Sequence, residues 1–175
     1  MSSTPRGFRR TGPGRVRENV GFGYADFTVG LTIEHRPGRT VSDMDNVLFT
    51  ALSGNTAPIH LDAHYSAATE WEKPLVCSIV TLALVGGMTV RATSGLTTGN
   101  LGFESIRFPH PVFVGDTLYA QTEILSRRLS RSRPAHGIVT CRTSSTNQHG
   151  DTVITYQRSF LVPADPGPIR AATDY

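Results

Sequence analysis

The chain has 175 residues, of which 38% are hydrophobic, a size and composition typical of one globular domain with its own core. It carries 17 Lys and Arg against 14 Asp and Glu, a net charge of +3, and has two cysteines, which lie far apart. These values favour a reduced, cytoplasmic protein over a disulfide-stabilised secreted one. No apolar stretch reaches the length of a membrane span, so we expect no membrane partner.

The two ends of the chain are expected to lie outside the domain. Residues 1–23 combine Gly, Pro and Arg without an apolar run, which is typical of a flexible basic tail and not of a secretory signal. Residues 163–175 are rich in Pro and are expected to form a second tail. Residues 24–162 are therefore taken as a single domain.

The first expected elements are a strand and a short helix. Apolar residues alternate through 27–41, interrupted by a turn at Gly30. Ser42 is placed to cap a helix, and Asp43 and Asp45 suit the positive end of its first turn. Apolar residues at helical spacing predict a face of this helix that packs on another surface: Met44, Val47, Leu48 and Ala51.

The remainder of the chain predicts one long helix and a sheet. After a short helix over 63–70, capped by Asp62, residues 76–90 are apolar around almost the whole helical circumference, as in a buried helix. Four later segments have strand character: 100–108, 116–130, 137–147 and 152–162. The pattern predicts an α+β fold with a curved antiparallel sheet wrapped around one long apolar helix.

The turn Ser53-Gly54-Asn55-Thr56-Ala57-Pro58-Ile59-His60 is the segment most suggestive of chemistry. Its small residues and its proline bend the chain, so the Asn55 amide and the His60 imidazole can enter one pocket. Histidine is the side chain that exchanges protons near neutral pH. The alternative is a polar loop in which His60 makes a structural hydrogen bond.

This turn resembles the active-site signature of the MaoC-like hydratases, the (R)-specific enoyl-CoA hydratase branch of the hot-dog fold. That signature reads Ser/Thr-Gly-Asp-x-Asn-Pro-aliphatic-His. Asn55 stands where the family has its catalytic aspartate, and Ala57 stands where it has asparagine. The resemblance continues in 73–78 and in the Pro-Val-Phe-Val-Gly-Asp run of 111–116, and it covers the chain from about residue 24 to residue 162.

The resemblance implies a hot-dog fold and a homodimer or dimer of dimers. It also implies an acyl-CoA as the small-molecule substrate, with no cofactor apart from the coenzyme A that is part of that substrate. Arginine clusters favour anionic partners, but no recognised nucleic-acid motif accompanies them, so no nucleic acid is expected.

Hydration of an enoyl thioester needs a base for the attacking water, an acid that protonates C2, and donors for the enolate oxygen. His60 is the candidate base, and the backbone N–H groups of Cys77 and Ser78, where the apolar helix begins, are the candidate oxyanion donors. Asn55 is not a proton carrier at neutral pH, but its amide can orient water. Alternatively, a carboxylate from elsewhere replaces the aspartate, the candidates being Asp62, Asp45 and Glu104.

An amide at position 55 would not repel a substrate that carries its own carboxylate. Segments 45–52 and 100–104 also resemble the branch that handles mesaconyl- or itaconyl-type CoA esters. The second carboxylate of such a substrate would meet Arg107 or His110. The arginines that would pair with the coenzyme A phosphates are Arg127, Arg128, Arg131 and Arg133. Ordinary surface roles are the alternative for all six residues.

Two other functions are left open. A hot-dog acyl-CoA thioesterase would usually place an acidic residue on or near the central helix, and 77–90 contains none, although Glu70 and Glu72 precede it. The missing aspartate also fits a catalytically weak subunit that binds acyl-CoA or a partner. Cys77 lacks the partners of a nucleophile and is interpreted as a residue of the helix start or the pocket wall.

Overall fold

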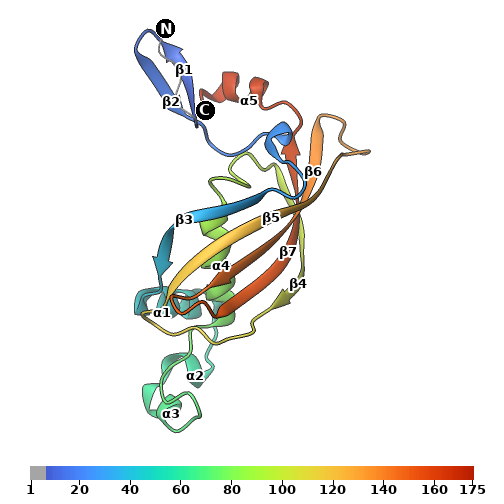
Figure 1. Cartoon of the computed structure of the whole chain (residues 1–175). Coiled ribbons are helices and arrows are strands. Elements are labelled where there is room, and N and C mark those ends of the chain that lie inside the picture. Colours follow the sequence, from blue (N-terminus) through green and yellow to red (C-terminus); the bar gives the residue numbers. More distant parts are fainter. Residues whose placement is uncertain (1–6) are drawn as a thin grey trace.

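The computed structural model describes residues 7–175, whose main feature is one curved, unclosed antiparallel sheet with a helix on its concave side (Figure 1). The strands are β3 (Thr32–Thr40), β4 (Gly99–Arg107), β5 (Thr117–Leu129), β6 (His136–Thr146) and β7 (Thr152–Pro163). Their spatial order is β3-β5-β6-β7-β4, and every neighbouring pair is antiparallel. The four late strands are confirmed, and the first strand, expected within 27–41, runs from Thr32 to Thr40.

Strand register is fixed partly by polar side chains on the inner face of the sheet. The His35 Nε2 atom lies 2.9 Å from the Thr122 hydroxyl, which lies 2.9 Å from the Thr143 hydroxyl on the next strand. All three residues are buried. Burial, reinforced by the neighbouring Arg36 charge, lowers the pKa of His35, so this ring stays neutral within the core.

Helix α4 (Ser78–Thr89) lies across the concave face of the sheet (Figure 1). Its buried residues include Val80 and Val85, which belong to the same core as Leu118 and Tyr156 of the sheet. The helix expected over 76–90 is thus confirmed. The expectation that this helix is buried on all sides is wrong. The sheet does not close around the helix, and Ile79 is 48% exposed. No helix of residues 7–175 is long and apolar enough to cross a membrane.

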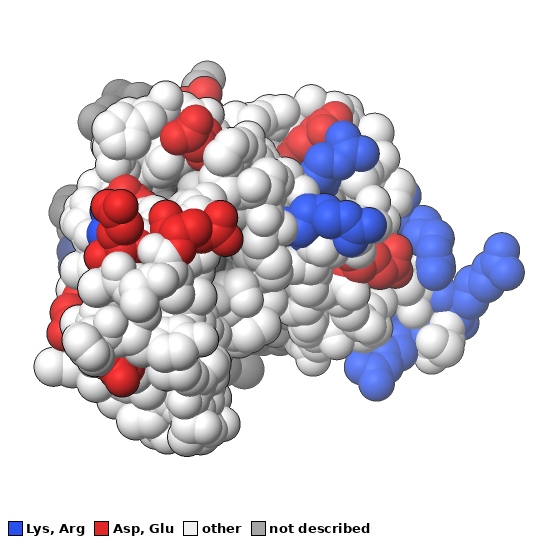
Figure 2. Space-filling view, turned by 90° about the horizontal axis from the view of Figure 1, so that it is seen from below, with Lys and Arg blue, Asp and Glu red and all other residues white. Residues whose placement is uncertain are grey.

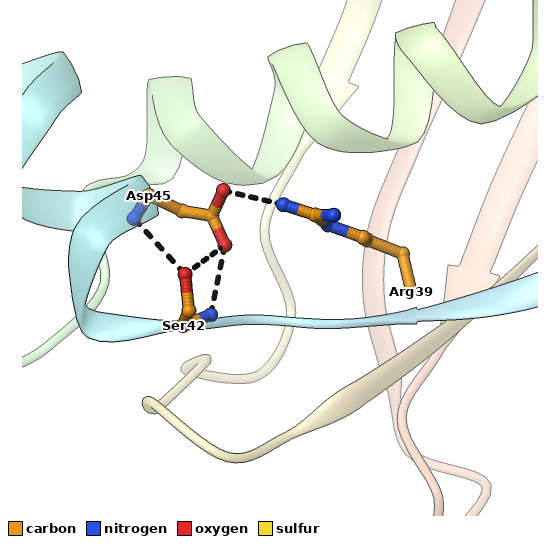
Figure 3. Close-up of polar contacts among 3 residues, drawn as sticks. All are labelled: Arg39, Ser42 and Asp45. Atoms are coloured by element: carbon orange, nitrogen blue, oxygen red, sulfur yellow. Dashed lines mark hydrogen bonds and ion pairs between the residues drawn. The ribbon is translucent and has the colours of Figure 1, made fainter.

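Helix α1 (Asp43–Ser53) begins with the expected cap (Figure 3). The Ser42 hydroxyl accepts a hydrogen bond from the Asp45 backbone N–H at 3.2 Å, and the Asp45 carboxylate accepts one from the Ser42 N–H at 2.8 Å. The Arg39 guanidinium pairs with the other carboxylate oxygen at 2.6 Å. The helix ends at Gly54, whose φ of 66° lies in the left-handed region that suits glycine.

The face that α1 buries is not the one expected. Met44 and Leu52 are 68% and 79% exposed, and Val47, Leu48 and Ala51 are also exposed. The buried residues of the helix are Asn46 and Thr50. Polar contacts therefore decide which side of α1 faces inward, and the packing expected of the apolar stripe stays a prediction for a surface outside residues 7–175.

Two short helices follow, α2 (Pro58–Leu61) and α3 (Ala63–Ala67). The Asp62 carboxylate accepts a hydrogen bond from the Tyr65 N–H at 2.9 Å, so its expected capping role is confirmed. His60 lies on α2 and not on an open loop, and α3 is shorter than the helix expected over 63–70. Both helices project from the lower end of the sheet (Figure 1).

The segments expected as tails contain regular structure. Strands β1 (Phe8–Gly12) and β2 (Arg15–Glu18) pair as a hairpin, and a 3-10 turn, η1 (Tyr24–Asp26), leads into the sheet. Helix α5 (Gly167–Thr173) lies near the other end of the chain, where the following Asp174 forms an ion pair with Arg17. Residues 1–6 lie outside the described residues, and the domain limits at 24 and 162 stay a prediction.

The Asp45 cap makes stability depend on pH. Burial opposes ionisation of the Asp45 carboxyl, but hydrogen bonds from Ser42 and the charge of Arg39 outweigh it and lower the pKa. A carboxyl with a lowered folded-state pKa stabilises the protein above its unfolded pKa, and this stabilisation is lost as the pH falls through the folded-state pKa. We expect Asp45→Asn to reduce the free energy of unfolding by about 1 kcal/mol at pH 7 and by less below about pH 4.

Urea denaturation at both pH values measures this effect. Asp43→Asn is the matched control, because Asp43 also lies in the first turn of α1 but is exposed and outside the Ser42 cap. Equal losses for the two variants would contradict the assignment of the cap to Asp45.

Candidate active site

A cavity of about 340 Å³ lies where α2, the start of α4 and the segment after β4 meet. We call it the His60 pocket. Most of its lining is apolar, and it also contains two imidazoles and the first residue of α4. Its lining residues are His60, Trp71, Leu75, Val76, Ser78, Thr81, Phe108, Pro109, His110, Pro111, Val112 and Val153.

The His60 ring is held by the segment that precedes α4. Its Nδ1 atom lies 2.9 Å from the Leu75 carbonyl oxygen. A carbonyl oxygen only accepts hydrogen bonds, so Nδ1 carries the hydrogen and a neutral ring keeps its lone pair on Nε2. The backbone itself therefore selects the tautomer that leaves Nε2 able to take a proton.

The start of α4 supplies backbone donors beside this ring. The first bond of the helix ladder runs from the Thr81 N–H to the Cys77 carbonyl, so the N–H groups of Ser78, Ile79 and Val80 have no acceptor within the helix. The Cys77 N–H donates to the Asn46 side-chain oxygen at 2.9 Å. Of the two expected oxyanion donors, Cys77 is therefore already engaged, whereas Ser78 lines the pocket. Cys77 itself is buried at the helix start.

Asn46 holds the pocket together and was missed by the sequence analysis. Besides accepting from Cys77, its side-chain N–H₂ donates to the His60 carbonyl at 2.9 Å and lies 3.4 Å from the Leu75 carbonyl. Asn46 is only 2% exposed. One signal for Asn46 is present in the sequence: it lies on the side of the helix opposite the apolar stripe, one turn before Thr50. The apolar stripe was taken as the buried side instead.

Asn55 lies beside the pocket and is not among its lining residues. Its side-chain oxygen accepts a hydrogen bond from the Ala57 N–H at 3.0 Å, which tightens the turn before α2. Its amide nitrogen lies 3.5 Å from the Cys77 sulfur. One N–H and one oxygen lone pair remain for a further partner. That Asn55 orients water stays a prediction.

None of the carboxylates suggested as substitutes lines the His60 pocket. Asp62 caps α3, and Asp45 is engaged by Ser42 and Arg39. Glu104 is exposed on β4, 3.4 Å from the Gln157 amide. Within residues 7–175 the pocket lining contains no Asp or Glu, so the structure gives no support to a replacement carboxylate.

The two residues suggested for a second substrate carboxylate are placed differently. His110 lines the pocket, and its Nδ1 atom lies 2.9 Å from the Thr152 carbonyl, which leaves Nε2 available. Arg107 is exposed at the end of β4, donates to the neighbouring Ile106 carbonyl, and does not line the pocket.

The four arginines suggested for coenzyme A are not brought to this pocket. They lie at the far end of β5 and in the turn to β6, where Arg127 donates to the carbonyls of Tyr24 and Ala25. Ten residues of strand separate Arg127 from Thr117, about 33 Å at the rise of a β-strand. In the view from the α3 end, Lys and Arg side chains gather mainly on the right of the molecule (Figure 2). One chain alone therefore does not join the arginines to His60.

Asn46 gives a direct test of how the pocket is supported. We expect Asn46→Ala to lower the free energy of unfolding by about 2 kcal/mol, because the Cys77 N–H loses its acceptor in a buried setting. Chemical denaturation measures the loss, and faster hydrogen exchange of the Cys77 amide locates it. Ser53→Ala, which removes a hydroxyl bonded only within α1, is the control, and a loss no larger than in that variant would contradict this role.

Comparisons with known proteins find a matching family model and several relatives. A family model described as a MaoC like domain matches residues 26–147. The mesaconyl-CoA hydratase of Cereibacter sphaeroides is 32% identical over 147 residues, which cover 84% of this chain and 43% of that protein. The (R)-specific enoyl-CoA hydratase of Aeromonas caviae is 32% identical over 115 residues, 66% of this chain and 81% of that protein.

A solved Mycobacterium tuberculosis protein, described as having a double hotdog fold, matches with a TM-score of 0.74 and 26% identity, over 83% of this chain and 45% of that one. The expected hot-dog fold is thereby confirmed. The chain spans less than half the length of the mesaconyl-CoA hydratase it matches. Because the family model covers most of the residues that form the sheet and the pocket, the chain belongs to the MaoC-like domain family.

Proposed function

We propose that the protein is an enoyl-CoA hydratase/dehydratase, which adds water to the C2–C3 double bond of an enoyl-CoA thioester or removes it. The observation that carries this proposal is the fixed tautomer of His60 in a pocket shared with the free N–H end of α4. Both relatives named above are hydratases of CoA thioesters, which supports the same reaction class.

The reaction needs only groups of this pocket, the Asn55 amide beside it, and water. His60 Nε2 takes a proton from water as the water oxygen bonds to C3, and the electrons of the double bond move onto the thioester oxygen. The Ser78 N–H and the positive end of α4 stabilise that enolate oxygen. The imidazolium then returns its proton to C2, so one water is added and His60 is regenerated. Asn55 orients the water through its remaining N–H or oxygen lone pair.

The proposed substrate carries a second carboxylate, as in mesaconyl-CoA or itaconyl-CoA. The name of the Cereibacter sphaeroides relative supports this acyl class. An amide at position 55 does not repel such a group, whereas an aspartate would. His110 is the better partner for the second carboxylate, since Arg107 lies outside the pocket. The bond requires the imidazolium form of His110, in which Nδ1–H keeps its bond to the Thr152 carbonyl and Nε2–H donates to the carboxylate.

The substrate assignment predicts a preference among CoA esters. We expect kcat/KM for mesaconyl-CoA or itaconyl-CoA to exceed that for crotonyl-CoA by about tenfold or more, because one charge-assisted hydrogen bond distinguishes them. His110→Gln should lose most of this preference while keeping crotonyl-CoA hydration. Loss of enoyl absorbance measures each rate. Equal or faster hydration of crotonyl-CoA by the unaltered protein would reject the dicarboxylic substrate.

The role of His60 is tested separately. We expect His60→Ala to lower kcat by about 10²–10⁴-fold, the usual contribution of a general base. His64→Ala is the matched control, because His64 is exposed on α3 outside the pocket. Circular dichroism checks that both variants are folded. Unchanged activity in His60→Ala would exclude this mechanism.

The same assays separate the alternative functions. A thioesterase would release free thiol, whereas hydration removes the enoyl absorbance and leaves the thioester intact. Glu70 and Glu72, which kept the thioesterase alternative open, are exposed and do not line the pocket, which argues against it. A catalytically weak binding subunit would show no activity for His60→Ala to remove.

We further propose that two copies associate through an exposed apolar face. This face joins α1, α4 and β4: its residues are Met44, Leu48, Leu52, Ile79, Ala83, Leu101 and Phe103. Exposed apolar side chains on these three elements favour a protein partner. The Mycobacterium tuberculosis protein carries a double fold in one chain, and a second copy supplies the equivalent here, as a homodimer or as a dimer of dimers.

A further inference from the structure

Four of the residues that line the His60 pocket are buried, and they form its floor. Three of them belong to the hydrophobic core, so the pocket ends against packed side chains: Val76, Val112 and Val153. The fourth is Thr81, which is 2% exposed and is the polar member of this floor. The exposed lining residues, His110 among them, form the mouth. The deep end of the pocket is therefore apolar except for one threonine.

The Thr81 hydroxyl has no hydrogen-bond partner within residues 7–175, although its residue is buried. The other buried threonines of this part of the chain all use their hydroxyls in hydrogen bonds: Thr50, Thr89, Thr93, Thr122 and Thr143. Thr81 is also not one of the described residues whose hydroxyl is both unpartnered and sealed from solvent. Its oxygen therefore opens into the pocket that it lines. Because a buried hydroxyl without a partner opposes folding, we expect a ligand to supply one.

Thr81 lies one helical turn after Ser78, whose N–H is the proposed donor to the thioester oxygen. Residues three apart share a face of a helix, and both of these line the pocket. Because coenzyme A leaves through the mouth, an acyl group held at Ser78 points toward the floor. The fourth carbon of that acyl group, counted from the thioester carbon, lies within the length of one helical turn from the first. The Thr81 hydroxyl is therefore placed to meet a group on the fourth carbon.

We propose that the Thr81 hydroxyl binds a carboxylate on the fourth carbon of the acyl group, and so selects a dicarboxylic CoA ester over an aliphatic one. This inference rests on the proposed function, because it places the thioester at Ser78. Both oxygens of a carboxylate accept hydrogen bonds, so Thr81 binds it from the floor while His110 binds it from the mouth. A crotonyl group carries a methyl group at this carbon and leaves the hydroxyl without a partner.

The test compares two CoA esters that have no double bond to hydrate. Succinyl-CoA carries a carboxylate on the fourth carbon, and butyryl-CoA carries a methyl group there. We expect the unaltered protein to bind succinyl-CoA at least about tenfold more tightly. Thr81→Val, which replaces the hydroxyl by a methyl group, should reduce this ratio about tenfold, because one hydrogen bond to a charged group is lost. Thr81→Ser keeps the hydroxyl and should retain the ratio. Isothermal titration calorimetry measures each dissociation constant.

Thr89→Val is the matched control for this test. Thr89 is equally buried on the same helix, but its hydroxyl donates to the Gly86 carbonyl at 2.8 Å, and it does not line the pocket. The ratio of the two dissociation constants stays unchanged in this variant. An unchanged ratio in Thr81→Val, or an equal fall in Thr89→Val, overturns the proposal. Equal binding of the two esters by the unaltered protein overturns it as well.

The stability of the ligand-free protein gives a second measurement, which a structural hydroxyl would move in the opposite direction. Removing a buried hydroxyl that lacks a partner in the protein leaves stability unchanged or raises it, whereas removing a bonded one lowers it. We therefore expect the midpoint of urea denaturation to be equal or higher in Thr81→Val and lower in Thr89→Val. If the midpoint falls as far in Thr81→Val as in Thr89→Val, the hydroxyl is bonded within the protein, and the proposal is overturned.

Failure of the proposed function is distinguished from failure of this inference, because calorimetry needs no turnover. If the unaltered protein hydrates no CoA ester, the hydratase function is overturned, while the two dissociation constants still decide whether Thr81 recognises the carboxylate. If hydration proceeds and the ratio does not respond to Thr81→Val, the hydratase function stands and the role of Thr81 alone is rejected.

Discussion

The candidate site depends on one buried amide. Asn46 accepts a hydrogen bond from the Cys77 N–H and donates one to the His60 carbonyl. These bonds tie α1, α2 and the start of α4 into one unit, with the Leu75 carbonyl at its centre. The same carbonyl fixes the His60 ring. The position of the imidazole relative to the helix end is thus set by backbone groups that a single side chain holds, and not by packing of the pocket wall.

This arrangement also explains why α1 exposes its apolar side. Asn46 and Thr50 are one turn apart, so both face the pocket loops. The Thr50 hydroxyl donates a hydrogen bond to the Asn46 carbonyl. The apolar residues of α1 then face outward, beside the uncovered side of α4. Sequence periodicity predicted the helix correctly because the apolar spacing is regular. It did not predict the buried side, because periodicity does not tell whether an apolar stripe meets its own domain or another copy.

The strands and the central helix were predictable, since buried residues alternate along β6 and most of β5, and most of Ser78–Thr89 is apolar. The resemblance of the turn at 53–60 also directed attention to His60. Distances between remote segments were not predictable. The arginines near residue 130 and the turn near residue 55 are both polar and both suited to a CoA ester, yet strand length alone places them at opposite ends of the sheet. The role of Asn46 was not predictable, because it depends entirely on hydrogen bonds to segments that are remote in the sequence.

The buried row of His35, Thr122 and Thr143 has a further consequence for how this fold tolerates change. Side chains of a strand alternate between its two faces, so deleting one residue from β5 upstream of Thr122 would turn that hydroxyl outward. Glu123, the next residue of β5, would turn inward in its place and bring a charged group into the core beside His35. Evolution of this sheet is therefore expected to proceed by substitution, with length changes confined to the turns between strands.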